Sequence, residues 1–145
     1  MAQRCHDAAA RRGKNVSCIG CMQDLQKEFR EYWNAVDKRR KAAKIDVLTG
    51  QINTLSDYDF SALYEAYIHN TQEDELADII ITCATWYRAA ELAEEGSFSA
   101  QRSFDMLLAS GAINFVLHQT TQANNLAAFR KVLNLKMKFN EVRED

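Results

Sequence analysis

The sequence predicts an all-α protein, a helical bundle of four long helices with shorter helices beside them. Two observations predict this fold class. Proline is absent and only 5 of the 145 residues are glycine, although tight β-turns depend on these two residue types. Apolar residues also recur at intervals of three and four along most of the chain, which is the spacing of a buried helix face. The length suits a single domain over residues 1–145.

The composition excludes several classes of protein. Hydrophobic residues make up 47% of the chain and charged residues 26%, values that are ordinary for a globular protein. No apolar run approaches the ~20 residues that a membrane-spanning helix needs. The basic start of the sequence lacks the apolar block of a signal peptide. We therefore expect a cytoplasmic protein with reduced cysteines and no membrane partner.

The net charge of −2 is unevenly distributed along the chain. Residues 1–44 carry +6, residues 45–100 carry −10 and residues 101–145 carry +2. An acidic middle between basic flanks allows carboxylates to face cations in a bundle, or to gather around a metal. The basic run from Lys38 to Lys44 would suit a nucleic-acid-binding bundle, but the overall charge argues against nucleic acid as a partner.

The first two predicted helices cover residues 2–12 and 18–43. Gly13 ends the first helix, and Ser17 is a suitable N-cap for the second. The second helix ends in cations that suit the negative end of a helix dipole. It should bury one apolar stripe, which comprises Ile19, Met22, Leu25, Phe29, Tyr32, Trp33 and Val36.

Capping residues mark the remaining helices. Thr71 is a good N-cap for the third long helix and has Asp74 at the third helical position, a variant of the capping box. This helix should stop before Gly96, and Ser97 or Ser99 should open the fourth. The other predicted elements are a connector over 45–58, a short helix over 59–69 capped by Ser56 or Asp57, and a last helix over 122–140.

Two acidic pairs stand at the margins of apolar stripes, Glu28 with Glu31 in the second helix and Glu75 with Asp78 in the third. A separation of three residues places both side chains of a pair on one helix face. If the two helices pack antiparallel, the four carboxylates converge, and a hard cation such as Mg²⁺ would stabilise them. By spacing alone, solvated charge on both helices is the alternative interpretation.

The residues around these pairs resemble three motifs of the MazG-like, all-α nucleoside triphosphate pyrophosphohydrolases. Residues 28–33, EFREYW, are similar to the first family motif, E-x-x-E. Residues 72–81, QEDELADIII, resemble the second motif, in which E-E-L-A/G-D-V/I precedes an apolar helix. Residues 136–143, KMKFNEVR, are similar to a K-M-x-Y-N-x-x-R stretch. The three motifs occur in the order that the family has.

The resemblance implies an Mg²⁺-dependent enzyme, with Mn²⁺ as an alternative metal, that cleaves a nucleoside triphosphate or its deoxy form. Cleavage between the α and β phosphates would yield the monophosphate and pyrophosphate. Family members generally form dimers or dimers of dimers, so a homodimer or homotetramer is expected. The implied metal-binding and catalytic residues are Glu28, Glu31, Glu75 and Asp78, and the implied substrate-binding residues are Lys136, Asn140 and Arg143.

Two features depart from the family pattern. Forty-three residues separate Glu31 from Glu75, more than the usual short hairpin, so we expect an insert over 45–70 that forms a lid or lengthens the connector. The basic tail that often follows the last motif is missing, because this sequence stops at Glu144 and Asp145. These departures support the alternative function, a catalytically silent helical-bundle binding or scaffold protein.

Two further sets of residues have a structural and a functional interpretation. Cys18-x-x-Cys21 could be half of a zinc site or a redox pair, but small apolar residues at the start of a helix are the simpler interpretation. Aromatic residues on a helical stripe are usually part of the core, although a few could stack on a base. The candidates for stacking are Trp33, Trp86, Tyr87 and Phe139.

Overall fold

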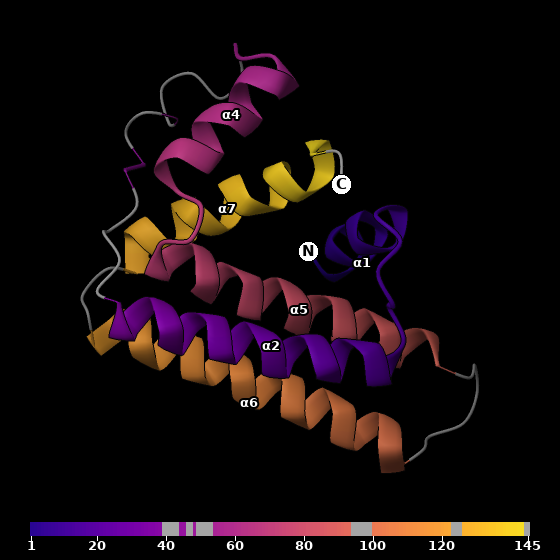
Figure 1. Cartoon of the computed structure of the whole chain (residues 1–145). Coiled ribbons are helices and arrows are strands. Elements are labelled where there is room, and N and C mark those ends of the chain that lie inside the picture. The colour runs from indigo at the N-terminus through magenta and orange to yellow at the C-terminus, as the bar shows by residue number, and fades with distance from the viewer. Residues whose placement is uncertain (39–43, 46–47, 49–53, 94–99, 123–125, 144–145) are drawn as a thin grey trace.

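A computed structural model describes residues 1–38, 44–45, 48, 54–93, 100–122 and 126–143. Within these ranges the protein is all-α, with six helices and no strand, which confirms the predicted fold class. No helix in the described ranges combines the length and the apolar character that a membrane span requires. The helices are α1 (Ala2–Arg11), α2 (Cys18–Asp37), α4 (Asp57–Tyr67), α5 (Gln72–Leu92), α6 (Ala100–Gln122) and α7 (Leu126–Val142) (Figure 1).

The predicted capping side chains start three of these helices. Ser17, Ser56 and Thr71 each accept a hydrogen bond from the backbone N–H three residues later, at 3.1, 3.1 and 3.3 Å. Each bond satisfies one of the N–H groups that the first turn of a helix leaves without an intrahelical partner. Because Ser56 and not Asp57 is the cap, α4 begins two residues earlier than predicted.

Other predicted boundaries change or fall outside the described residues. Gln122 belongs to α6, and α7 begins at Leu126, so the predicted start of the last helix is wrong. α2 ends at Asp37, and its predicted continuation over 39–43 lies outside the described residues. The serines proposed to open the fourth helix, within 97–99, also lie outside them.

α5 is the central helix of the bundle. α1, α2, α6 and α7 all pack on it, and 14 of its 21 residues are buried. α2 and α6 both run antiparallel to α5, while α4 lies at the other side of the molecule and packs on α7 (Figure 1). Because neighbouring helices cover α5 on most sides, it has no face that is fully exposed to solvent. The acidic residues Glu73, Asp74 and Glu75 in its first turn are therefore buried as well.

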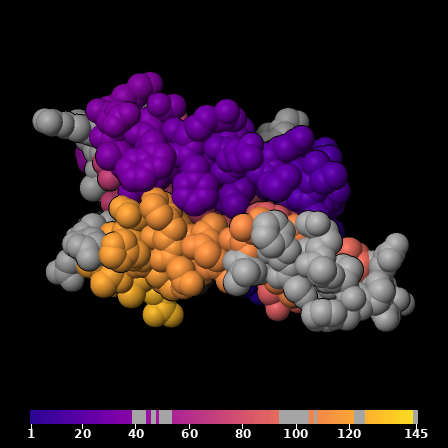
Figure 2. Space-filling model, turned by 90° about the horizontal axis from the view of Figure 1, so that it is seen from below, coloured from indigo at the N-terminus to yellow at the C-terminus, as the bar shows by residue number. Residues whose placement is uncertain are grey.

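The prediction for the buried stripe of α2 is confirmed in part: Leu25 and Tyr32 are buried, and Phe29 and Val36 pack against the core from partly buried positions. Three residues of the predicted stripe, Ile19, Met22 and Trp33, are 65%, 39% and 47% exposed. They lie on the outer surface of α2, which runs beside α6 across one face of the molecule (Figure 2). The buried stripe repeats at intervals of four and three residues and contains an acidic residue. It comprises Cys21, Leu25, Glu28, Tyr32 and Ala35, and Gly20 is buried beside its first residue.

Candidate metal centre

Three carboxylates converge between α2 and α5. Glu28 comes from the buried stripe of α2, and Glu75 and Asp78 come from the first two turns of α5. One oxygen from each carboxylate lies within 4.8 Å of the other two. They meet because α2 and α5 are antiparallel and because residues three apart share a helix face. Glu28 and Glu75 are each 4% exposed. We call these three residues the acidic triad.

The acidic triad could hold a metal ion. Magnesium binds oxygen at about 2.1 Å, so two ligand atoms on opposite sides of it lie roughly 4.2 Å apart. The spread of the triad, 4.8 Å at most, is therefore close to the span of one coordination sphere. All three donors are carboxylates, which are ligands for hard cations and not for soft ones.

Burial makes it costly for the three carboxyl groups to be ionised together. Burial and then the charge of Asp78 raise the pKa of Glu28 to about 8. Burial, with the charges of Asp78 and Asp74, raises the pKa of Glu75 to about 7. Burial also raises the pKa of Asp78, against the opposing effect of Lys136. A cation between these groups would offset both their desolvation and their mutual repulsion.

The ammonium group of Lys136 contacts the acidic triad at Asp78. Its Nζ atom lies 2.8 Å from Oδ1 of Asp74 and 2.9 Å from Oδ2 of Asp78. Burial lowers the pKa of this ammonium, but the charges of Asp78 and Asp74 outweigh it and leave the pKa above its usual value. Lys136 is therefore charged and orients Asp78. Because a carboxylate has two oxygens, Asp78 can contact Lys136 through Oδ2 and a metal through Oδ1.

The Asp74 carboxylate contacts groups from three segments of the chain, and it thereby holds the Lys136 ammonium in position. The Tyr64 hydroxyl donates to Asp74 Oδ1, and the Asn70 N–H donates to Oδ2 at 2.9 Å. His69 Nδ1 lies 3.3 Å from Oδ2. Asn70 has a φ of 62°, the left-handed conformation that Asn adopts more readily than most residues. Burial raises the pKa of Asp74, but His69, Lys136 and Tyr64 together lower it to about 2.

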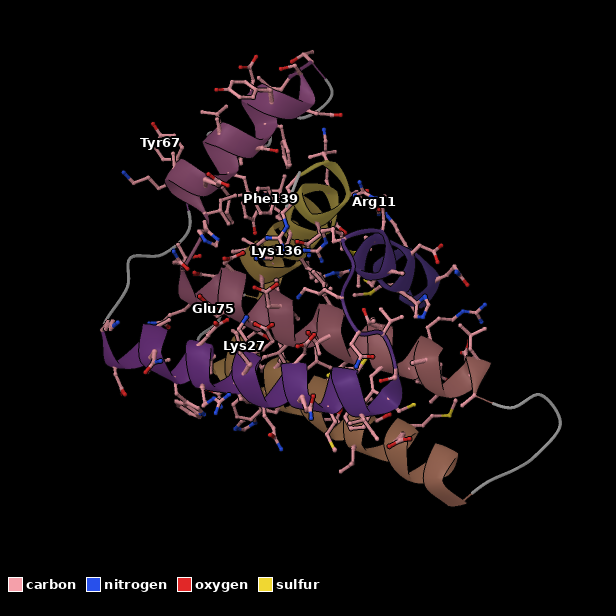
Figure 3. All side chains as sticks on the ribbon, turned by 45° about the vertical axis from the view of Figure 1, so that its right-hand side comes forward. Arg11, Lys27, Tyr67, Glu75, Lys136 and Phe139 are labelled. Atoms are coloured by element: carbon pink, nitrogen blue, oxygen red, sulfur yellow. The ribbon has the colours of Figure 1, made fainter. Side chains whose placement is uncertain are left out.

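The acidic triad opens into a polar cleft of about 440 Å³. This volume lies within the ~300–1,000 Å³ that is usual for small-molecule sites. Figure 3 shows Lys136 of α7, Glu75 of α5 and Lys27 of α2 gathered around it. Every residue that lines the cleft is polar or charged: Lys14, Lys27, Glu28, Glu31, Asn34, His69, Asn70, Glu75, Asp78, Lys136 and Arg143.

Glu31 lines the cleft but does not belong to the acidic triad. Its side chain is 41% exposed, and Lys27 Nζ lies 3.4 Å from its carboxylate. Lys27 Nζ also lies 4.0 Å from Glu28. The structure thus brings three of the four predicted acidic residues into one group and leaves Glu31 at the side of the cleft.

The three predicted substrate-binding residues lie in different surroundings. Lys136 and Arg143 line the cleft. Asn140 is 4% exposed and lines a smaller pocket, of about 30 Å³, which adjoins the cleft at Glu28 and Asp78. Its Oδ1 atom has no hydrogen-bond partner among the described residues. We call this smaller space the inner pocket.

The four aromatic candidates for base stacking do not line the cleft. Trp86 and Phe139 are 1% and 2% exposed, and the Phe139 ring stacks on Tyr64 with centroids 4.4 Å apart. These two residues therefore belong to the core. Trp33 and Tyr87 are exposed on the surface of the bundle.

The paired cysteines of α2 are packing residues. Cys18 and Cys21 are both free, and burial raises the pKa of Cys21 to about 12, which makes its thiol unreactive. In the part of the chain that the structure describes, the one group able to hold a metal contains neither cysteine nor histidine.

Sequence reasoning missed three residues near the cleft, namely Asp74, His69 and Lys14. The capping box assigns Asp74 only a local role at the start of α5. The signal that points further is the run of three consecutive acidic residues in this first turn, which is more negative charge than one helix N-terminus needs. His69 and Lys14 carry no local signal, because each reaches the cleft through tertiary structure. Glu28 did carry one, since it falls in step with the residues of the buried stripe of α2.

No family model, no curated protein and no solved structure matches this chain. The resemblance to the MazG-like enzymes therefore rests on the three short motifs. The arrangement of the site has to be judged by its own chemistry.

Proposed function

We propose that the protein is an Mg²⁺-dependent, MazG-like nucleotide pyrophosphohydrolase, which cleaves a nucleoside triphosphate between the α and β phosphates. The observation that carries the proposal is the convergence of Glu28, Glu75 and Asp78 within 4.8 Å at a cleft with basic side chains. The three motifs of the resemblance supply these carboxylates and Lys136. Chain segments that are distant in sequence thus contribute to one site, which supports the proposal.

The donor set favours Mg²⁺ or Mn²⁺ over a softer metal, because three carboxylates offer only oxygen. Glu28, Glu75 and Asp78 would hold the ion. When bound, the metal would neutralise phosphate oxygens and increase the acidity of a water molecule. The resemblance implies that Lys136 contacts phosphate. In this structure Lys136 contacts two carboxylates, so we assign it instead the role of positioning Asp78.

Glu31 is the residue best placed to accept a proton. It lines the cleft beside the acidic triad and stands outside the group that would hold the metal. In the proposed reaction the oxygen of a water molecule attacks phosphorus, its proton passes to the Glu31 carboxylate, and pyrophosphate leaves with the electron pair of the broken P–O bond. Arg143, which lines the same cleft, would neutralise phosphate charge.

The test is release of pyrophosphate from a panel of ribo- and deoxyribonucleoside triphosphates, with Mg²⁺, with Mn²⁺ and with a chelator. We expect pyrophosphate and monophosphate in equal amounts, and none with the chelator. Glu28→Gln should abolish the activity, whereas Glu65→Gln, at an exposed position on α4, serves as the matched control. Metal binding without turnover of any nucleotide would instead favour the alternative, a catalytically silent binding protein.

We also propose that the protein is a homodimer or homotetramer, as the resemblance implies. Support comes from Ile19, Met22 and Trp33 of α2 and from Leu108 and Leu117 of α6, which are between 39% and 65% exposed. α2 and α6 lie side by side on one face (Figure 2), and large apolar side chains exposed on neighbouring helices suit an interface between copies. Analytical ultracentrifugation should find an oligomer, and Trp33→Glu should shift it toward the monomer.

A further inference from the structure

The chain between α1 and α2 is fixed at its first end by the way α1 terminates. Gly13 has a φ of 74°, a conformation that glycine adopts at little cost. The Gly13 N–H donates to Ala10 O at 3.0 Å, and the Lys14 N–H donates to Ala9 O at 3.1 Å. This pair of bonds is the Schellman motif of a helix C-terminus. The backbone of Lys14 is thereby held against α1.

The second end of this segment is fixed on α2. The Ser17 N–H donates to Asn15 Oδ1 at 3.1 Å. Asn15 packs so closely on Gly20 that a Cβ atom there would lie 2.5 Å from the Asn15 carbonyl oxygen. Glycine at position 20 therefore permits the close approach of the segment to α2, and Lys14 is held between two anchored ends.

α1 itself is fastened to the end of α7. The Arg4 guanidinium forms an ion pair with Glu141, and Arg11 donates to the backbone carbonyl oxygen of Asn140 at 3.3 Å. Arg143, the residue that follows the end of α7, lines the cleft. These contacts bring basic residues from the two ends of the described chain to one place beside the acidic triad.

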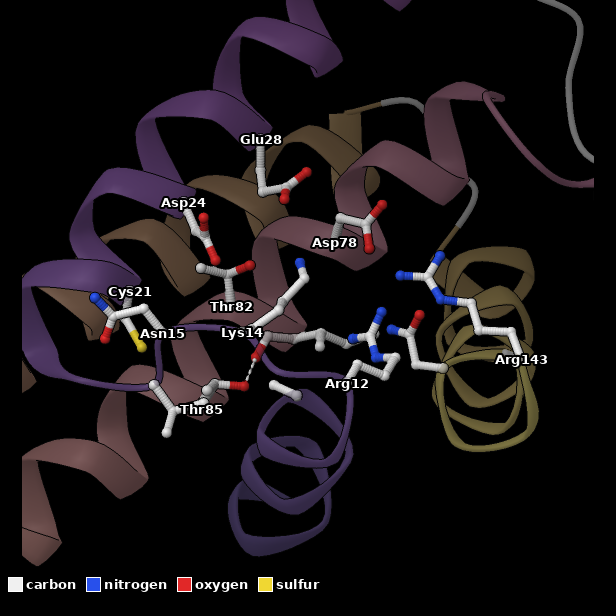
Figure 4. A pocket seen from close by; sticks show the side chains of 14 residues that line it. Arg12, Lys14, Asn15, Cys21, Asp24, Glu28, Asp78, Thr82, Thr85 and Arg143 are labelled. Carbon is white, nitrogen blue, oxygen red and sulfur yellow. Dashed lines mark hydrogen bonds between the residues drawn. The ribbon is translucent and has the colours of Figure 1, made fainter. Parts of the chain in front are cut away.

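Lys14 and Arg143 both line the cleft and the inner pocket, as do Glu28 and Asp78. Figure 4 shows the ammonium of Lys14 directed toward Glu28 and Asp78, with the Arg143 guanidinium on the α7 side of Asp78. No ion pair joins Lys14 to another residue of the described chain, although it is close enough to lower the pKa of Asp78. The Lys14 side chain thus points at the place where a metal would lie.

The inner pocket contains an independent sign that a polar ligand belongs here. Asn140 is 4% exposed, and its Oδ1 atom is an acceptor without a partner among the described residues. A buried acceptor that lacks a hydrogen-bond partner destabilises the fold, because it has lost its bond to water. The inner pocket, of about 30 Å³, has room for a water molecule or a hydroxyl group, which would satisfy it.

We propose that Lys14, together with Arg143, binds the phosphate chain of the substrate. This inference rests on the proposed function. A triphosphate keeps a net negative charge after it binds one divalent cation, and its remaining oxygens need donors of positive charge. Lys14 is the lysine beside the acidic triad that is not already bound to a described carboxylate.

The experiment is calorimetric titration of inorganic tripolyphosphate, in the presence of Mg²⁺, into the wild-type protein and three variants. The variants are Lys14→Gln, Lys14→Arg and, as the matched control, Lys131→Gln at an exposed position on α7. Titration with Mg²⁺ alone is carried out on the same proteins. We expect Lys14→Gln to weaken tripolyphosphate binding about tenfold, Lys14→Arg to retain most of it and Lys131→Gln to leave it unchanged. The Mg²⁺ affinity should not fall in any of them.

Two other results would overturn the inference, and they differ in whether the proposed function survives. Equal tripolyphosphate affinity in wild type and Lys14→Gln, with Mg²⁺ binding intact, would show that Lys14 does not contact the phosphate chain, while the proposed function would stand. Absence of Mg²⁺ binding by the wild-type protein would remove the proposed function and this inference with it. Because tripolyphosphate has no base or sugar, neither result depends on knowing the preferred nucleotide.

Discussion

The Nζ atom of Lys136 lies 2.8 Å from Oδ1 of Asp74, and the two side chains are only 3% and 1% exposed. This ion pair joins α7 to the first turn of α5, one helical turn before the acidic residue Asp78. A buried ion pair offsets its desolvation only while both partners remain. The pair therefore links the stability of the bundle to the geometry of the acidic triad.

Loss of the Lys136 charge should destabilise the fold, because it leaves Asp74 buried without its cation. We expect Lys136→Met to lower the free energy of unfolding by about 3–5 kcal/mol. Lys131→Met, at an exposed position on the same helix, should change it by less than ~0.5 kcal/mol. Urea denaturation measures both. The double variant Asp74→Asn/Lys136→Met should be more stable than the sum of the single effects predicts, and strict additivity would contradict the coupling.

Asp74 should also make the protein sensitive to acid. Its pKa is lowered from 3.8 to about 2, so folding favours the ionised form. The stabilisation is present above pH ~4 and is lost as the pH falls toward 2. Thermal melts between pH 2 and 5 should show this loss, and Asp74→Asn should have a flatter profile over the same range. An unchanged profile would mean that another group controls acid unfolding.

Glu28 should have the opposite effect on stability. Its pKa is raised from 4.5 to about 8, so the metal-free fold favours the protonated form and loses a few kcal/mol as the pH rises from about 5 to 8. Mg²⁺ binds the ionised form, so it should raise the melting temperature more at pH 8.5 than at pH 5.5. Glu28→Gln should stabilise the metal-free protein at pH 8.5 and abolish the effect of Mg²⁺. Glu65→Gln is the control.

Substitutions in the acidic triad should weaken Mg²⁺ binding, whereas substitution of Glu31 should slow only the chemical step. Glu75→Gln should weaken Mg²⁺ binding and, through it, lower kcat/KM at least 100-fold. Glu31→Gln should keep the Mg²⁺ affinity and lower kcat by about 10²–10⁴-fold, the usual contribution of a general base. Calorimetry with Mg²⁺ and steady-state kinetics distinguish the two classes. Loss of Mg²⁺ binding in Glu31→Gln would place Glu31 among the metal ligands.

Two glycines within helices offer a matched pair of substitutions. An alanine at position 20 would bring its Cβ to 2.5 Å from the Asn15 carbonyl oxygen, whereas nothing lies within 4 Å of a Cβ at position 111. Gly20→Ala should therefore displace the segment that carries Lys14 and lower the melting temperature. Gly111→Ala should stabilise α6 by roughly 0.5–1 kcal/mol. Differential scanning calorimetry would test this contrast, and equal effects would refute the close packing at Asn15.

The parts of the fold that depend on local chemistry could be predicted from the sequence. Ser17, Ser56 and Thr71 cap helices through bonds that span three residues, and such bonds need no tertiary structure. The buried stripe of α2 could be predicted only in part, at Leu25 and Tyr32. Hydrophobicity alone favours the large residues Ile19 and Trp33, which are exposed, whereas the smaller Cys21 and Ala35 are buried.

In the candidate site, too, the features set by local spacing could be predicted, whereas those set by tertiary packing could not. The spacing of Glu75 and Asp78 places them on one face of α5 whatever surrounds the helix. Their meeting with Glu28 required the further assumption that α2 and α5 are antiparallel, which the structure confirms. The contact between Lys136 and Asp74 spans 62 residues of sequence, and Lys14 reaches the cleft only because α1 ends beside it. No local pattern encodes such contacts.

α4 packs on α7 and not between the two helices that carry the carboxylates (Figure 1). The entropic cost of closing a loop grows only with the logarithm of its length, by about 0.6 kcal/mol for each doubling. The 43 residues between Glu31 and Glu75 could therefore vary in length outside α4 while α2 and α5 still meet, whereas loss of α4 would remove the Tyr64 donor from Asp74. Spacing within each helix is thus under tight geometric constraint, whereas the connecting chain can vary in length wherever it makes no contact with the site.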